Sequence, residues 1–477
     1  MKQLLNVVML LLLFNNSSAQ NVGIGVPIPT EKLQVAGNIK ADTLKPNALK
    51  LMLNAGTGKV LTSDAEGNAN WQVNGNTGFG VWGDCATNGN ISEYNPVVDE
   101  TGAIGDDFGF AVSISNNFAI IGAYSDQVGA NVNQGSASIY QYNGTNWILM
   151  QKITDATGAA GDSYGFSVSI SGNYAILGAY ADDVGANANQ GSVSIYFYNG
   201  TTWVLMQKIT DPAGIAGDQF GVSVCISGNY AIVGTSGSDV GANVNQGSGS
   251  IYFYNGITWV LMQKITDATG AASDFFGTSV SLSGNYAILG AEGDNVGANT
   301  DQGSANIYRY NGTSWILMNK ITDATGTPLD YFGGNVSISG NYAIVGSRGD
   351  DVGVNNDQGS SSIYFNNGSA WVLMQKLTEA TGSAGDNFGT CVSISGNYAT
   401  VGASFDDVGT NLNQGTANIY QRVGLGWQKL QYLTDPAGNA DDYFGSSTAI
   451  DGINKRFLNG AYGYAGSSGK VVFGKVN

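Results

Sequence analysis

Residues 164–179 read YGFSVSISGNYAILGA, and close copies of this stretch recur along the chain at one fixed interval. The Phe-Gly or Tyr-Gly step near its start occurs seven times, always 56 residues after the previous one, at residues 108, 164, 220, 276, 332, 388 and 444. A fixed period of this length is typical of supersecondary units that bury their faces against their neighbours. The period therefore predicts the architecture, but it does not identify a ligand.

One repeat predicts four antiparallel strands. Residues 164–171 alternate bulky and small side chains, which is the period-two pattern of a strand. A second apolar run covers residues 174–180, a third covers 192–198, and a fourth covers 203–210 after the hairpin turn Asn199-Gly200. Four antiparallel strands repeated around a ring form a β-propeller, whereas a solenoid of stacked hairpins is the structural rival.

The two ends of the repeat array are out of phase. The last repeat has strand patterns near residues 446–450, 456–461 and 470–475, so its fourth strand is missing. Residues 91–98 precede the first Phe-Gly step and align, one period earlier, with the fourth strand at 147–154. We therefore predict an all-β fold: a seven-bladed β-propeller of four-stranded antiparallel blades. The N-terminal strand would close the ring and remove its open sheet edges.

Composition limits the classes of partner. The chain of 477 residues carries 19 basic and 36 acidic residues, a formal charge of −17. This charge opposes binding to nucleic acid or to an anionic membrane, because both need a positive surface, but it permits cation binding. The chain has no His, which removes the commonest general base and transition-metal ligand. Cys85, Cys225 and Cys391 are too scattered for a disulfide framework, and we interpret the last two as packing residues.

The chain divides into four segments. Residues 1–19 have the pattern of a signal peptide, with Lys2, a short apolar run and small residues before the cleavage point. We expect a β-rich stem over 20–75, a Gly- and Asn-rich linker over 76–90, and the propeller over 91–477. No stretch is long enough to span a bilayer. We therefore expect a secreted or cell-surface protein, in a bacterial envelope or outside the cell.

The repeat resembles the FG-GAP repeat. The resemblance rests on the Phe-Gly step, the following Ser-Val-Ser-Ile, and Gly-Ala at the end of the second strand, as at Gly178-Ala179. FG-GAP repeats build the seven-bladed propeller of integrin α-subunits and of many bacterial surface proteins. Over about residues 90–477 the resemblance implies extracellular adhesion or ligand binding. Integrin-type repeats often carry a calcium loop between the first two strands, but Ser171-Gly172-Asn173 lacks its carboxylates, which argues against an inherited calcium site.

The stem resembles segments of bacterial surface and tail-fibre-like proteins. The resemblance is carried by Val22-Gly23-Ile24-Gly25, by KLQVAG at residues 32–37 and by GKVLTSD at residues 58–64. It implies a short β-rich stalk, which is sometimes trimeric, so we expect that a homotrimer could form through the stem.

Two series of acidic residues fall on one face of the predicted ring. The loop between strands two and three shares this face with the loops between blades, while the other face carries tight turns. One series precedes each Phe/Tyr-Gly step by two residues: Asp106, Asp162, Asp218, Asp274, Asp330, Asp386 and Asp442. The other follows each fourth strand: Asp99, Asp155, Asp211, Asp267, Asp323, Glu379 and Asp435. We interpret both series as turn builders that accept backbone N–H bonds.

The loop between strands two and three is the candidate calcium site, because calcium prefers carboxylate, amide and carbonyl oxygens. The candidate ligands are Asp182, Asp183, Asn187 and Asn189 in repeat two, Asp350, Asp351, Asn355 and Asp357 in repeat five, and Asp406, Asp407, Asn411 and Asn413 in repeat six. The alternative is a structural loop, since the dense Asp alternation and terminal Glu of a recognised calcium loop are missing. We expect no other cofactor.

Three functions fit this sequence. The first is an exported adhesion or recognition protein that binds a glycan or protein through the acidic loop face. The second is a structural or matrix spacer, and the third is a polysaccharide lyase or hydrolase with a site in the channel. We expect no catalysis, because no repeat carries an acid, base or nucleophile that the others lack. We interpret Arg309, Arg348 and Arg422 as inert surface residues, and the Trp at the start of the fourth strand in six repeats as packing rather than a sugar platform.

Overall fold

The structure, a computed structural model, describes residues 22–24, 33–35, 59–63, 69–73 and 91–477. The chain splits into two compact units, residues 1–79 and 80–477. In the first unit, β1 (Val22–Ile24) pairs in parallel with β2 (Leu33–Val35), and β3 (Lys59–Ser63) pairs antiparallel with β4 (Ala69–Val73). The predicted signal peptide and linker lie outside the described residues, and a trimer through the stem stays a prediction.

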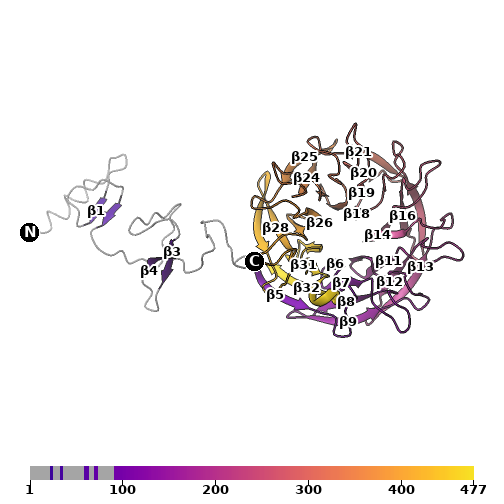
Figure 1. The fold of residues 1–477 in the computed structure, drawn as a ribbon, viewed down its shortest axis with the longest axis horizontal. Coiled ribbons are helices and arrows are strands. Elements are labelled where there is room, and N and C mark those ends of the chain that lie inside the picture. Colours follow the sequence, from indigo (N-terminus) through magenta and orange to yellow (C-terminus); the bar gives the residue numbers. More distant parts are fainter. Residues whose placement is uncertain (1–21, 25–32, 36–58, 64–68, 74–90) are drawn as a thin grey trace, which may run out of the picture. The chain divides into compact units, whose positions relative to one another are not determined.

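The second unit is a ring of seven four-stranded antiparallel sheets (Figure 1). The first strands of the blades are β6 (Ala111–Ser115), β10 (Ser167–Ser171), β14 (Phe220–Ser227), β18 (Val280–Ser283), β22 (Asn335–Ser339), β26 (Phe388–Ser395) and β30 (Ser447–Asp451). The second strands are β7 (Phe118–Ala123), β11 (Tyr174–Ala179), β15 (Tyr230–Thr235), β19 (Tyr286–Ala291), β23 (Tyr342–Ser347), β27 (Tyr398–Ala403) and β31 (Arg456–Ala461). The third strands are β8 (Ser136–Tyr142), β12 (Ser192–Tyr198), β16 (Ser248–Tyr254), β20 (Ser304–Tyr310), β24 (Ser360–Asn366), β28 (Thr416–Val423) and β32 (Lys470–Val476). The fourth, outermost strands are β9 (Trp147–Ile153), β13 (Trp203–Ile209), β17 (Trp259–Ile265), β21 (Trp315–Ile321), β25 (Trp371–Leu377), β29 (Gly426–Leu433) and β5 (Ile91–Val97).

The ring closes as predicted. Strand β5, at the start of the propeller, pairs antiparallel with β32, at the end of the chain, and Asn95 lies opposite Phe473. The seventh sheet therefore has the order β30-β31-β32-β5. This pairing confirms the propeller and excludes the solenoid.

Close contact between blades explains the two glycines of the repeat. A Cβ on Gly178, at the end of β11, would collide with the carbonyl oxygen of Gly221, the glycine of the next Phe-Gly step. Gly221 itself has a φ of +93°, a conformation that other L-residues rarely adopt. The same contact closes the ring, where Gly460 meets the carbonyl of Gly109. The repeat thus needs glycine at both positions to bring successive blades together.

Serines on the first strands also join neighbouring blades. Ser169 Oγ accepts a hydrogen bond from the backbone N–H of Ile226 in the next blade, at 3.1 Å. In blade three Cys225 takes the place of the serine, and its Sγ accepts from the N–H of Leu282 at 3.3 Å. Cys391 makes the matching contact to Thr448. The two described cysteines are therefore packing residues in these contacts between blades, as predicted.

The hydrophobic core lies between adjacent blades. Tyr164, Val168 and Ile170 of blade two are buried in one cluster with side chains of blade one and Trp203. Each described Trp at the start of a fourth strand is buried, which confirms packing. Phe166 departs from the predicted alternation: it is half-buried and lines the channel, because the chain turns between Ser163 and Phe166 before β10 begins.

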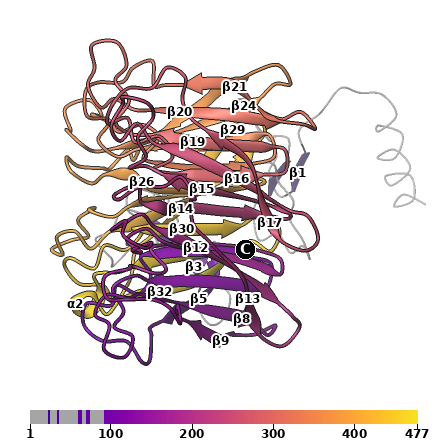
Figure 2. The same cartoon turned by 90° about the vertical axis from the view of Figure 1, so that its right-hand side faces the viewer.

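One face of the ring is rich in loops, as Figure 2 shows at its left edge. It carries the loops between blades, the loops between second and third strands, and the short helix α2 (Tyr464–Ser467) in blade seven. The other face carries the predicted tight turns, such as Asn143-Gly144, where Asn143 Oδ1 accepts two backbone N–H bonds. Within the described part of the chain, no helix is long and apolar enough to cross a membrane.

Candidate functional site

The repeats differ most where the central channel opens on the loop-rich face. Three positions in each blade change from repeat to repeat, while the Asp, Phe-Gly and Gly-Ala residues around them are nearly constant. The first position follows the Phe/Tyr-Gly step: Phe110, Phe166, Val222, Thr278, Gly334, Thr390 and Ser446. The second lies directly after the second strand, two residues beyond its last Gly: Tyr124, Tyr180, Ser236, Glu292, Arg348, Ser404 and Tyr462. The third precedes the Phe/Tyr-Gly step: Asp107, Ser163, Gln219, Phe275, Tyr331, Asn387 and Tyr443. We call these 21 residues, three in each of seven blades, the channel mouth.

The mouth opens into a cavity of about 520 Å³. All seven residues of the first position line this cavity. Below them the wall consists of small residues of the first strands, such as Ser167, Ser223 and Val224. A volume of this size falls within the range of about 300–1,000 Å³ that is usual for small-molecule sites.

Seven aromatic side chains form a continuous series around one side of the mouth. We call them the aromatic arc: Phe110, Tyr124, Phe166, Tyr180, Phe405, Tyr443 and Tyr462. Neighbouring ring centres lie 4.4 Å apart for Phe166 and Tyr180 and 4.9 Å apart for Phe110 and Phe166. The series continues at 5.7 Å from Phe110 to Tyr462, at 5.1 Å to Tyr443, and at 5.3 Å to Phe405. The arc therefore spans blades six, seven, one and two.

The opposite side of the mouth is polar. The carboxylate of Glu292 in blade four forms an ion pair with Arg348 in blade five, with 2.5 Å between Oε2 and Nη1. The guanidinium of Arg348 also lies 4.3 Å from the centre of the Tyr331 ring. In blade three, Ser236 Oγ donates to Gln219 Oε1 at 3.2 Å. The aromatic mouth residues thus gather mainly in blades seven, one and two, beside Phe405 of blade six, while Phe275 and Tyr331 stand among the polar groups of blades four and five.

The third position of the mouth has an unfavourable backbone conformation. All seven residues have left-handed φ angles, from 54° at Phe275 to 60° at Gln219. The loops between second and third strands use Asn or Asp for the same conformation, as at Asn189 and Asp357, and these residues tolerate it better. Glycine would fit with the least strain, yet no repeat has glycine there. Each blade therefore keeps a side chain at the mouth at some cost in backbone energy.

The first Asp series builds turns, as the sequence predicts. Asp274 Oδ2 accepts a hydrogen bond from the N–H of Ala271 at 2.6 Å, and the other six residues make the equivalent bond. Burial raises the pKa of all seven carboxyls. The pKa reaches about 6 at Asp274 and Asp386, where nearby carboxylates add to the effect of burial.

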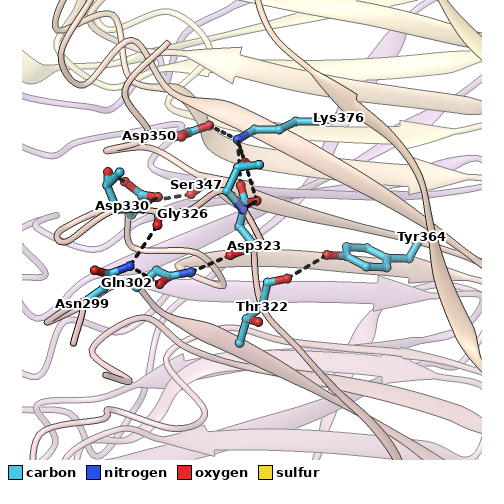
Figure 3. Close-up of polar contacts among 12 residues, drawn as sticks. Asn299, Gln302, Thr322, Asp323, Gly326, Asp330, Ser347, Asp350, Tyr364 and Lys376 are labelled. Atoms are coloured by element: carbon cyan, nitrogen blue, oxygen red, sulfur yellow. Dashed lines mark hydrogen bonds and ion pairs between the residues drawn. The ribbon is translucent and has the colours of Figure 1, made fainter. Parts of the chain in front are cut away.

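The second series also builds turns, and it is joined to a lysine. Figure 3 shows this arrangement at Asp323, which lies 2.7 Å from Lys376 Nζ through its Oδ2. The same Nζ lies 2.6 Å from Asp350 Oδ2, so one lysine holds two carboxylates. Burial acts to raise the pKa of Asp323, but hydrogen bonds from Lys376 and Thr325 outweigh it and lower the pKa. Lys152, Lys208 and Lys320 hold two carboxylates in the same way.

The carboxylates of the candidate calcium loops have partners within the protein. In repeat two, Asp182 Oδ2 lies 2.7 Å from Lys208 Nζ, and Asp183 Oδ1 accepts from the N–H of Asn189 at 2.9 Å. In the other two repeats Asp350 pairs with Lys376, Asp351 accepts from the N–H of Asp357, Asp406 accepts from the hydroxyls of Thr416 and Tyr432, and Asp407 accepts from the N–H of Asn413.

The amides of these loops connect one blade to the next. Asn187 Nδ2 donates to Gln190 Oε1 at 2.9 Å and to the carbonyl of Gly214 at 3.1 Å. Asn355 and Asn411 make the same pair of bonds. Among the described residues, no group of three or more His, Cys, Asp or Glu is placed to hold a metal. The candidate ligands thus lie in loops that are satisfied by protein contacts, and calcium binding stays a prediction.

The channel mouth was missed by the sequence reasoning. Arg348 was interpreted as an inert surface residue, but the structure pairs it with Glu292 at the mouth. Glu292 and Arg348 are also charged groups that the other repeats lack at this position, so the expectation of uniform repeats was wrong there. Arg309 is exposed in β20, and Arg422 lies over the Tyr342 ring. A comparison of the seven repeats position by position would have revealed the mouth.

Six segments of the chain match the profile of the FG-GAP repeat: residues 95–140, 147–196, 203–254, 259–308, 315–364 and 371–420. Each match begins in the fourth strand of one blade and continues into the third strand of the next, as residues 147–196 run from β9 to β12. No match to the chain is found among curated proteins. The six segments cover more than half of the chain. The chain therefore belongs to the FG-GAP repeat family.

Proposed function

We propose that this protein is a non-catalytic recognition protein that binds an extracellular glycan or protein at the channel mouth. The proposal rests on one observation. The residues that build the blades are nearly the same in all seven repeats, whereas the residues of the channel mouth differ from repeat to repeat. The fold of an FG-GAP propeller is consistent with protein binding or adhesion. A rigid ring that presents different side chains at one opening is suited to asymmetric recognition, since binding residues commonly lie on loops held by a scaffold.

The ring itself does not require the residues of the mouth. Phe166 and Tyr180 in blade two correspond to Val222 and Ser236 in blade three, and both blades have the same four strands. The aromatic side chains are therefore not needed to form a blade. Aromatic residues and arginine contribute strongly to binding sites, because they offer a large contact area at a small entropic cost.

The proposal includes export and the absence of catalysis. Export is supported by the signal-peptide pattern of residues 1–19, and a stem over residues 20–75 would present the ring at a cell surface or in the medium. A homotrimer through the stem would multiply the binding sites and raise avidity. The absence of catalysis is supported at the mouth by the ion pair of Glu292 with Arg348, in which each charged group is held by the other.

The test compares variants of the two faces. The full chain would be assayed for saturable binding to collagen, fibronectin and a panel of polysaccharides. The variant Glu292→Ser/Arg348→Ser copies the serine that blades three and six carry, at Ser236 and Ser404, so we expect it to fold. The control is Ile257→Thr, at an 87% exposed position of the turn face. We expect binding that the mouth variant weakens and the control does not.

Two other outcomes would reject this proposal. No binding to any probe, together with regular self-assembly, would favour the structural spacer. Shortening of a polysaccharide during the incubation would favour a lyase or hydrolase.

A further inference from the structure

We infer that the aromatic arc binds a chain of neutral pyranose sugars, several residues long, at the channel mouth. This inference rests on the proposed function and names the ligand class of the same site. Phe110, Phe166, Phe405 and Tyr462 line the cavity itself, and Tyr124, Tyr180 and Tyr443 continue the series of rings beside them.

The arc is accessible to a ligand. Phe405 is 38% exposed, and the other six rings are half-buried rather than part of the core between blades. Partly exposed rings gathered at one opening keep apolar surface in contact with water, which is unfavourable unless a partner covers it. The C–H faces of a pyranose ring can cover such a surface by stacking on an aromatic ring.

The arc combines apolar ring faces with neutral hydroxyl groups. Four of its seven residues are tyrosines. Burial raises the pKa of Tyr124 and, to about 12, that of Tyr462, so these phenols keep their protons at neutral pH and can donate hydrogen bonds. A sugar has both apolar faces and hydroxyl edges. A lipid tail would offer only apolar contacts to this mixed surface.

The charge around the mouth favours a neutral ligand. The one cation of the second position, Arg348, is neutralised by Glu292 at 2.5 Å. At the edge of the arc, Asp107 accepts a hydrogen bond from Ser125 Oγ at 2.8 Å, and Asp441 is exposed beside Tyr443. The whole chain carries a formal charge of −17. A polyanion would be repelled as it approached, because the described residues place no unpaired positive group at the arc.

The length of the arc favours an oligosaccharide over a single sugar. Successive ring centres lie 4.4 Å to 5.7 Å apart from Tyr180 through Phe110 to Tyr462, and neighbouring rings are tilted by 39° to 64°, so the rings form one continuous apolar surface. The series extends over four of the seven blades. Several consecutive residues of a glycan can therefore contact the arc at once, and affinity should rise with chain length.

The experiment measures glycan binding by calorimetry with the full chain. The probes are neutral oligosaccharides of one to six residues from cellulose, laminarin, xylan, mannan and starch, with oligogalacturonate as the anionic comparison. The test variant Phe166→Val/Tyr180→Ser gives blade two the mouth residues of blade three, Val222 and Ser236. The first control, Ile257→Thr, changes the turn face. The second control, Thr201→Ile, makes the reverse exchange at the same exposed turn position of blade two.

We expect at least one neutral series to bind, with affinity that increases with chain length. The test variant should lose about tenfold in affinity, since it removes two stacking surfaces, while both controls stay close to the parent. Binding of oligogalacturonate alone, or glycan binding that Phe166→Val/Tyr180→Ser leaves unchanged, would overturn the inference. If no glycan binds, but a protein binds and Glu292→Ser/Arg348→Ser abolishes that binding, the inference is overturned and the proposed function stands.

Discussion

At the scale of the residue, each repeat uses small and acidic side chains to join blades rather than to bind a ligand. The sequence predicted the turn-building role of Asp274, because an Asp shortly after a Gly-rich turn commonly accepts backbone N–H bonds. It could not predict the partner of Ser169. That partner, Ile226, lies 57 residues away, in the next blade, and only the packing of neighbouring blades brings the two together. The sequence also could not pair Lys208 with Asp182, because that contact depends on how β13 and the loop after β11 lie within blade two, and this left Asp182 as a calcium candidate.

The carboxyls of the first Asp series predict a stability that rises as the pH falls from neutral. Asp274 has a pKa of about 6 in the folded chain against 3.8 as its ordinary value. The protonated form is thus favoured by folding, and its contribution is present below pH 3.8 and is lost as the pH rises through about 6. Asp99, Asp155, Asp267 and Asp323 have lowered pKa values, so their contribution is lost as the pH falls below their ordinary range. Thermal unfolding measured from pH 3 to pH 8 should therefore give the highest melting temperature near pH 4 to 6.

Two substitutions in one loop separate these effects. Asp274→Asn should keep most of the stability at pH 7 and reduce its dependence on pH between 5 and 7, since the carboxyl that titrates there is gone. Asp267→Asn should lower the free energy of unfolding at pH 7 by about 1–2 kcal/mol, because Lys320 loses a buried partner at 2.9 Å. Equal losses from both substitutions at pH 7 would contradict the assignment.

At the scale of the element, the strands of a blade could be predicted closely and the connections between blades could not. The second strand of the last repeat was predicted near residues 456–461, and β31 spans Arg456–Ala461. The first strand of repeat two was expected from residue 164, but β10 begins at Ser167 because Ser163 and Gly165 have left-handed φ angles. Alternation of side chains does not reveal such a break.

Blade seven shows how the lysine contact is conserved by a different residue. Pro96 in β5 stands at the position that Lys152 occupies in β9, so this blade lacks the usual cation. Lys470, on the neighbouring strand β32, pairs instead with Asp435. The ion pair is thus present in the blade where the ring closes. The fourth strand of this blade, β5, comes from the start of the propeller and carries no lysine at this position. This replacement indicates that the contact matters for joining blades.

The lysines predict a graded effect on stability. Lys376 lies between Asp323 and Asp350, whereas Lys264 holds Asp211 alone, because Ser238 replaces the second Asp. Lys376→Met should lower the free energy of unfolding by about 2–4 kcal/mol, since it leaves two carboxylates unpaired in a poorly hydrated site.

The matched variant Lys264→Met should cost about half as much, because it leaves one carboxylate unpaired. Both would be measured by urea unfolding at pH 7 and again at pH 4. The difference between the two variants should shrink at pH 4, where the carboxylates begin to take up protons. A larger loss for Lys264→Met than for Lys376→Met would contradict the two-carboxylate contact.

At the scale of the whole molecule, a nearly symmetric ring carries an asymmetric opening. The symmetry could be predicted, because a period of 56 residues and two complementary ends leave few alternatives to a closed ring of seven blades. The asymmetry could not be read from one typical repeat. Glu292 and Arg348 differ from their counterparts in every other blade, and Phe166 differs from all but Phe110. These residues meet at one opening because the ring places every blade around one channel.

Closure of the ring predicts that β5 supports the stability of all seven blades. Deleting Ile91–Val97 would leave the backbone N–H and C=O groups of β32 at an exposed sheet edge and remove the packing of Tyr94 against blades six and seven. Because each blade packs against the next, a defect in one blade weakens the contacts that hold the neighbouring blades. We expect a marked fall in the urea midpoint and greater self-association, since an open edge can pair with another chain.

The matched control deletes residues 76–82, seven residues of the predicted linker. An unchanged urea midpoint for the β5 deletion, measured against this control, would show that the pairing of β5 with β32 does not hold the ring together.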